Sequence, residues 1–164
     1  IQERPLMSGE GKGKVSTDDA TSFLATFENG ALGSFQATRL APGRKNFLRL
    51  EIFGSEGSLG FNLERLNELE YFDAGDAKAT QGYTNILVTD PVHPYLEAWW
   101  PPGHIIGWEH TFIHQVKALM EGIGNEKPVT PDFYDGVRCQ QVLDAVVAST
   151  LGKTWTKIPA YKKD

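Results

Sequence analysis

The residues whose types and spacing best suggest chemistry lie between Trp99 and Phe112, in the string WWPPGHIIGWEHTF. His110 and His114 stand four positions apart in a segment with helical apolar spacing, which places both imidazoles on one helix face. That spacing suits two ligands of one metal ion, with Glu109 beside them. A metalloprotease helix has the order His-Glu-x-x-His, however, and no later Cys, His or clustered carboxylate offers a third ligand. The pattern therefore favours ordinary helix histidines over a metal site.

A second candidate is His104, which follows the rigid turn Pro101-Pro102-Gly103 just before the same helix. A histidine held there beside Trp99 and Trp100 can hydrogen-bond a polar ligand, and tryptophan faces suit the C–H faces of sugars. The structural alternative is that both tryptophans pack the loop and that His104 caps the helix. The two interpretations stand about level, because rigid loops often hold functional residues.

The remaining candidate functional residues are less indicative of a particular chemical activity. Arg39 and Arg44 flank a connection between strands, where they can bind a carboxylate or phosphate, be solvated, or contact a neighbouring subunit. Cys139 has no activating neighbours and is interpreted as a packing residue. The glycines of residues 54–60 lie between two strands, which indicates a hairpin and not a phosphate-binding loop. The chain thus shows no complete catalytic machinery.

The elements that would position these residues follow from the apolar periodicity. Strands are predicted at 20–28, 31–39, 46–54, 58–62, 68–73 and 83–88, after a flexible loop over 8–14. Helices are predicted at 105–123 and 132–151. Strands followed by helices favour an α+β domain, with an antiparallel sheet and helices on one side. The other sheet face is expected to need a partner.

Composition narrows the function classes. The 164 residues fit one domain, and the net charge of −5 gives no reason to expect nucleic acid or an anionic membrane surface as partner. No apolar run approaches the ~18 residues of a membrane span. A single cysteine allows no internal disulfide, so a cytoplasmic location is expected. The chain begins as if within a strand, which suggests a fragment.

Several strings carry a family resemblance when taken in order. Residues 27–34 look like an F-x-N-G-A-x-G hairpin, and residues 50–59 look like an I-x-G-x-x-G-x-L turn. The further matches are residues 107–112, 133–136, 142–145, Ser149 and Trp155. Together, over about residues 18–158, they resemble the C-terminal domain of the Gfo/Idh/MocA oxidoreductases, the glucose–fructose oxidoreductase and inositol dehydrogenase family.

The resemblance implies a large, mostly antiparallel open-faced sheet with helices packed on one face. It also implies an N-terminal Rossmann domain that binds NAD or NADP and is absent from this chain. In the family, hydride moves between a sugar or polyol carbon and the nicotinamide, and the open sheet face forms a dimer or tetramer interface. The family's catalytic lysine is not carried onto Lys127, because Glu126-Lys127-Pro128 lies in a linker after a helix.

We therefore predict that residues 1–164 form the substrate-side and oligomerisation domain of an NAD(P)-dependent sugar or polyol dehydrogenase, inactive and without cofactor on its own. No catalytic residue is assigned. The resemblance places a substrate-pocket wall at the helix start, formed by His104, Trp108, His110 and Phe112, with Trp100 and Arg39 as additional members. Their roles would be stacking and hydrogen bonding to sugar hydroxyls. The alternatives are a stand-alone carbohydrate-binding or assembly module, and a small metalloenzyme.

Overall fold

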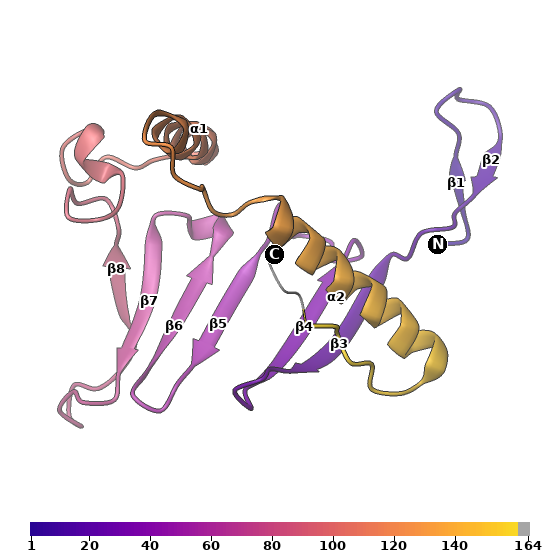
Figure 1. Ribbon diagram of the computed structural model, residues 1–164, viewed down its shortest axis with the longest axis horizontal. Coiled ribbons are helices and arrows are strands. Elements are labelled where there is room, and N and C mark those ends of the chain that lie inside the picture. The colour runs from indigo at the N-terminus through magenta and orange to yellow at the C-terminus, as the bar shows by residue number, and fades with distance from the viewer. Residues whose placement is uncertain (161–164) are drawn as a thin grey trace. The chain divides into compact units, whose positions relative to one another are not determined.

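The computed structural model describes residues 1–160 (Figure 1). The chain divides into two compact units, one made of Ile1–Arg44 with the residues from Gly136 onward, and one made of Lys45–Asp135. Every strand pairing in residues 1–160 is antiparallel, in sheets of two, two and four strands. The strands precede the two α-helices along the chain, so the predicted α+β class is confirmed.

The first unit opens with a short hairpin of β1 (Glu3–Pro5) and β2 (Lys12–Lys14). The sequence predicted only a flexible loop over residues 8–14, and for residues 12–14 this was wrong. Because Gly13 has no side chain, Leu6 lies directly over it, and a Cβ there would meet Leu6 Cδ2 at 2.8 Å. This close approach lets the lysine-rich segment fold back as a strand.

The longer hairpin of the first unit joins β3 (Ala20–Thr26) and β4 (Leu32–Thr38) in full register. Gly30 adopts a φ of 86°, a conformation that glycine reaches without strain, and Asn29 Oδ1 accepts a bond from the Ala31 N–H at 3.1 Å. Across the strands, Phe23 and Phe35 stack with ring centroids 4.9 Å apart. The Asn-Gly hairpin predicted from the sequence is confirmed.

Helix α2 (Phe133–Gly152) begins one residue after the predicted start. Asp132 caps it, since its Oδ1 accepts from the N–H groups of Tyr134 at 2.7 Å and Asp135 at 3.2 Å. In return, Asp135 Oδ2 accepts from the Asp132 N–H at 2.8 Å. This reciprocal arrangement satisfies the donors that a helix start leaves unpaired.

The second unit is built on a four-stranded meander in the order β5-β6-β7-β8 (Figure 1). Its strands are β5 (Arg49–Phe53), β6 (Gly57–Asn62), β7 (Glu68–Asp73) and β8 (Thr84–Leu87), with a 3-10 helix η1 (Leu63–Arg65) between β6 and β7. Strand alternation and register place one apolar set on a single face: Leu50, Ile52, Leu59, Phe61, Leu69, Tyr71 and Ile86. The opposite face is mixed, because it carries charged side chains together with Phe53, Phe72 and Leu87.

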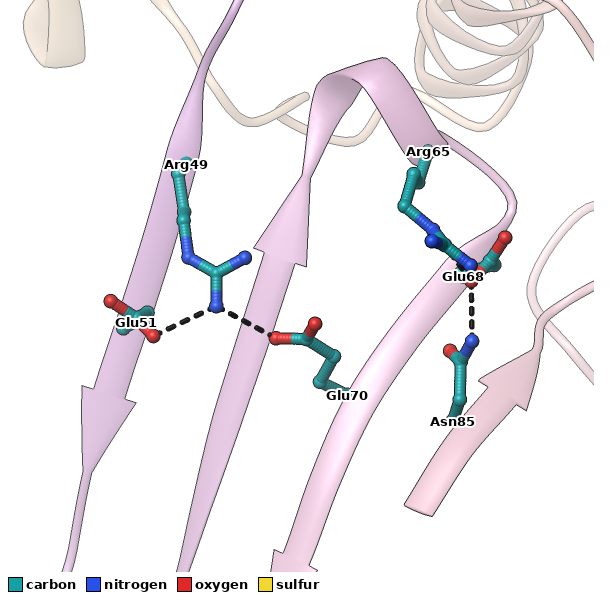
Figure 2. Close-up of polar contacts among 6 residues, drawn as sticks. All are labelled: Arg49, Glu51, Arg65, Glu68, Glu70 and Asn85. Carbon is teal, nitrogen blue, oxygen red and sulfur yellow. Dashed lines mark hydrogen bonds and ion pairs between the residues drawn. The ribbon is translucent and has the colours of Figure 1, made fainter. Parts of the chain in front are cut away.

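The opposite face carries an ion-pair network (Figure 2). Arg49 bridges Glu51 and Glu70 with two bonds of 2.9 Å, and these contacts raise the pKa of the Arg49 guanidinium. Hydrogen bonds to Glu68, first from Arg65 and then from Asn85, lower the pKa of that carboxyl. Since these groups are partly exposed, solvent screens them, and each ion pair contributes little to stability.

Few side chains of residues 1–160 are fully covered. Only Gly60, Thr89 and Leu96 are buried, and the latter two lie in the segment that follows β8. Helix α1 (Trp108–Gly124) presents an apolar stripe whose members are about half exposed: Phe112, Val116, Leu119, Met120 and Ile123. The sheet's apolar face and this stripe are thus two uncovered apolar surfaces of the second unit.

Candidate functional site

The segment between β8 and α1, residues 88–107, is fastened to the end of the sheet at several points. The side-chain amide of Asn67 clamps the backbone of Ile106, donating to its carbonyl and accepting from its N–H, both at 2.9 Å. Thr89, only 2% exposed, accepts through Oγ1 from the Gly103 N–H at 3.3 Å. The buried Leu96 lies in the short 3-10 helix η2 (Leu96–Ala98). The segment is therefore an ordered loop, which we call the held loop because side chains of Asn67 and Thr89 bind its backbone.

The turn that carries His104 is equally well defined. Gly103 has a φ of 90°, and the His104 backbone N–H donates to Pro101 O at 3.3 Å. His104 Nδ1 lies 2.8 Å from the same carbonyl, which assigns the proton of the neutral imidazole to Nδ1. Within residues 1–160 no hydrogen bond engages His104 Nε2, and the residue is exposed. Nε2 is therefore left as an acceptor for a ligand.

His110 lies at the start of α1, where it faces the N-cap residue Gly107. The Gly107 N–H donates to His110 Nδ1 at 3.0 Å, so a neutral His110 carries its proton on Nε2. Glu109 Oε1 is 3.7 Å from the same Nδ1, too long to compete with that bond. His104 and His110 therefore offer opposite functions, one an acceptor and the other a donor.

Behind this turn, one aromatic cluster joins the loop to the helix. The Trp99 indole N–H donates to His114 Nε2 at 2.7 Å. Tyr95 stacks on the His114 ring at 4.6 Å, and Trp99 meets the His110 ring edge-on at 4.5 Å. Burial, followed by the charges of His110 and Lys117, lowers the pKa of His114. His114 is thus favoured in the neutral form that its bond to Trp99 requires.

Four of the residues predicted as a pocket wall make aromatic contacts in two pairs, one in the loop and one in α1. Trp100 lies 6.5 Å from His104 between ring centroids, and Trp108 meets Phe112 edge-on at 6.1 Å. Trp100 is 70% exposed and Trp108 is 52% exposed, so both indoles present faces to a ligand. Arg39 follows β4 in the first unit, where its N–H donates to Asp19 O at 2.8 Å, and its place in the site stays a prediction.

The hydrogen bonds of His110 and His114 disfavour the alternative in which both imidazoles bind one metal ion. His110 Nδ1 and His114 Nε2 each use a lone pair to accept an N–H bond. In residues 1–160 no group of three His, Cys, Asp or Glu side chains comes together. The i, i+4 spacing instead places both rings against Trp99. The site as described suits hydrogen bonding and stacking.

Sequence reasoning missed three of the residues that hold this loop. Asn67 reaches the segment from the residue just before β7, and its sole signal in the sequence was an amide next to a turn. Thr89 and Tyr95 carried no signal beyond their place between two elements. Trp99 was recognised as a packing candidate, and His114 was weighed as a metal ligand against an ordinary helix histidine, but their pairing was not predicted. Their roles depend on contacts between residues 14 to 39 positions apart in the chain.

Comparison with known proteins gives the class to which this fold and site belong. Residues 4–60 match the GFO/IDH/MocA C-terminal domain family. The chain is 39% identical to levoglucosan dehydrogenase of Pseudarthrobacter phenanthrenivorans, over 97% of this chain and 44% of that protein. The chain therefore belongs to the GFO/IDH/MocA family as its C-terminal domain, and the resemblance seen in the sequence is confirmed.

The chain is also similar in structure to proteins whose structures have been solved. An oxidoreductase domain protein from Kribbella flavida superposes with a TM-score of 0.93 at 49% identity, covering 98% of this chain and 42% of that one. Levoglucosan dehydrogenase in complex with NADH and levoglucosan superposes with a TM-score of 0.87 at 38% identity, covering 91% and 41%. The chain thus spans less than half the length of the relatives it matches. None of the helices in residues 1–160 is both long and apolar enough to cross a membrane.

Proposed function

We propose that this chain is the substrate-side and oligomerisation domain of an NAD(P)-dependent sugar or polyol dehydrogenase that acts on a CH–OH group. The observation that carries the proposal is the held loop of residues 88–107 together with the first turn of α1. The loop presents the exposed Trp100 and the acceptor His104, and the helix start presents the exposed Trp108 and the donor His110. Similarity along the whole chain to a levoglucosan dehydrogenase supports it. A cytoplasmic location belongs to the same proposal.

The roles of the side chains follow from their chemistry. Trp100 and Trp108 would stack on the C–H face of a sugar ring. His104 Nε2 would accept a hydroxyl hydrogen, and His110 Nε2–H would donate to a hydroxyl oxygen. Phe112 would support Trp108 from the next helical turn, and Arg39 would donate to further hydroxyls. These contacts orient and hold the substrate, and none of them abstracts a proton.

The nicotinamide cofactor does not fit the described residues. Dinucleotide folds use a parallel strand, a glycine-rich turn and a helix N-terminus, whereas all pairings in residues 1–160 are antiparallel. The glycines at 54, 57 and 60 connect the antiparallel strands β5 and β6. NAD(P), which supplies the hydride acceptor, would therefore be held by another part of the parent protein. On this basis the isolated chain is inactive.

The proposal is tested on the full-length protein with a panel of sugars and polyols, including levoglucosan, glucose and inositol. We expect NAD(P)H to form with at least one of them, measured by absorbance. Trp108→Ala removes a stacking platform worth about 1 kcal/mol and should raise the sugar KM roughly fivefold. Trp155→Ala is the control, because Trp155 is also exposed, at 69% against 52% for Trp108, and lies in the other unit.

Two results would reject the proposal. One is the absence of NAD(P)-linked oxidation across the panel. The other is sugar binding by the chain alone with no redox activity of the parent, which would establish the carbohydrate-binding module instead. Isothermal titration of the chain with the same sugars distinguishes these two.

Self-association through an uncovered sheet face is the second part of the proposal. Leu50 and Ile52 on the apolar face of the meander are 51% and 53% exposed, which is unfavourable unless something covers them. The mass of the full-length protein by light scattering should be a multiple of the monomer. Ile52→Asp probes the apolar face and Glu70→Arg the ion-pair face, and one of them should lower the mass. A monomeric wild type would refute this part.

A further inference from the structure

The Trp99–His114 contact has no part in the substrate contacts listed above, yet it joins the loop to the helix that carries them. The indole N–H to Nε2 distance is 2.7 Å, and the acceptor ring is stacked against Tyr95 with planes 11° apart. Trp99 is half-buried and its ring also reaches His110. One side chain thus contacts both imidazoles of α1.

The bond depends on the protonation of His114. An imidazolium has only donors, so it offers no acceptor to the indole N–H. The charged or titratable groups near His114 are His110 and Lys117 on its own helix and Tyr95 and Glu97 from the 3-10 helix segment. Lys117 is itself paired with Glu121 at 2.5 Å and lies 5.8 Å from the centre of the Tyr95 ring. Burial, the Lys117 ammonium and any positive charge on His110 all oppose protonation of His114.

The same contact holds a strained backbone. Tyr95 has a φ of 68°, a left-handed conformation that costs a non-glycine residue of order 1 kcal/mol. Its ring stack on His114 is one of the contacts that hold it there. At the far end of the loop, Asn67 and His110 hold Ile106 and Gly107 independently. Losing the Trp99 bond would therefore loosen Trp99 and the turn that directly follows it, and would leave Ile106 and Gly107 in place.

We infer that Trp99 and His114 are positioning residues for sugar binding, because their hydrogen bond sets the orientation of the adjoining turn that carries Trp100 and His104. The inference rests on the proposed function of that turn. It predicts that sugar affinity, but not cofactor affinity, depends on a neutral acceptor at position 114.

The test compares variants of the full-length protein at matched pH. Trp99→Phe keeps a ring and removes the donor, and His114→Leu removes the acceptor. Each should raise the sugar KM about tenfold, with kcat and the NAD(P) KM within twofold, because a buried partner is left unpaired. His114→Gln restores an acceptor that does not titrate in this range and should restore the KM. His93→Gln is the control, since the side chain of His93 contacts only Asp90 in the described part of the chain.

A pH profile separates positioning from a merely structural role. The wild-type sugar KM should rise by up to about tenfold as the pH falls through the pKa of His114, while the KM of His114→Gln stays flat. A fully active wild type whose sugar KM is unchanged in both Trp99→Phe and His114→Leu overturns the inference alone. A wild type with no NAD(P)-linked oxidation of any sugar or polyol overturns the proposed function, and this inference with it. That holds even if the NMR resonance of the Trp99 indole N–H shows that the bond to His114 is present.

Discussion

The Asn67 clamp offers the most direct test of how the loop is held. Asn67→Leu keeps the approximate shape of the side chain and removes both of its 2.9 Å bonds to the Ile106 backbone. Each bond contributes about 1 kcal/mol, and a half-buried N–H or C=O left unpaired adds to the cost. The expected loss of local stability is therefore roughly 2–3 kcal/mol.

Hydrogen exchange measured by mass spectrometry on the full-length protein reads this loss directly. Local opening of residues 99–107 should become roughly 30- to 160-fold more frequent in Asn67→Leu, since each 1.4 kcal/mol is a factor of ten. Asn67→Asp should fall between the wild type and Asn67→Leu, because it still accepts from the Ile106 N–H and sets an oxygen against the Ile106 carbonyl.

Asn125→Leu is the matched control for this experiment. Asn125 also donates its side-chain amide to a backbone carbonyl, that of Glu121 at 2.8 Å, but it does so at the exposed end of α1. Its loss should leave exchange over residues 99–107 unchanged. Equal exchange in the wild type and Asn67→Leu would refute the reasoning, and so would the same acceleration in both variants.

Two further predictions concern the meander of the second unit. Gly57→Ala should destabilise the protein, because the added Cβ would lie 2.5 Å from the Phe72 carbonyl oxygen, whereas Gly82→Ala meets nothing within 4 Å and should be neutral in the same thermal melts. The pKa of Glu68 is lowered in the folded state, so its stabilising contribution is complete above the pKa of the unfolded chain and is lost as the pH falls through the folded value. The difference in melting temperature between wild type and Glu68→Gln should accordingly shrink toward zero in acid. A difference that stays constant with pH would contradict the ion-pair assignment.

Local patterns in the sequence were sufficient for most of the elements. Asn29-Gly30 predicted the hairpin between β3 and β4 because its left-handed turn needs no distant partner. The alternation of residues 46–54 predicted β5 and its two faces for the same reason. The strand at residues 12–14 was missed, since a run of lysines and glycines has no apolar period, and its pairing with residues 3–5 is a backbone contact that no local pattern announces.

In the candidate site, too, some features were predictable from local sequence patterns and others were not. That His104, Trp108 and His110 stand near a helix start was readable from the order of prolines, glycines and apolar residues. That His110 and His114 lie on one helix face followed from their spacing, but their partners did not. The pairing of His114 with Trp99 depends on how the 3-10 helix folds back on α1, which no local pattern specifies.

By itself, the sequence determined the α+β class, the antiparallel hairpins, the family to which the domain belongs and the absence of a glycine-rich cofactor loop between a strand and a helix. These properties depend on the period of side chains along the chain and on turn residues, which act over a few positions. Only the tertiary structure decided the tautomers of His104, His110 and His114, the clamp of Asn67 on Ile106 and the exposure of Trp100. Each of these depends on which atoms meet across the fold, because hydrogen bonds and burial are properties of contacts in space.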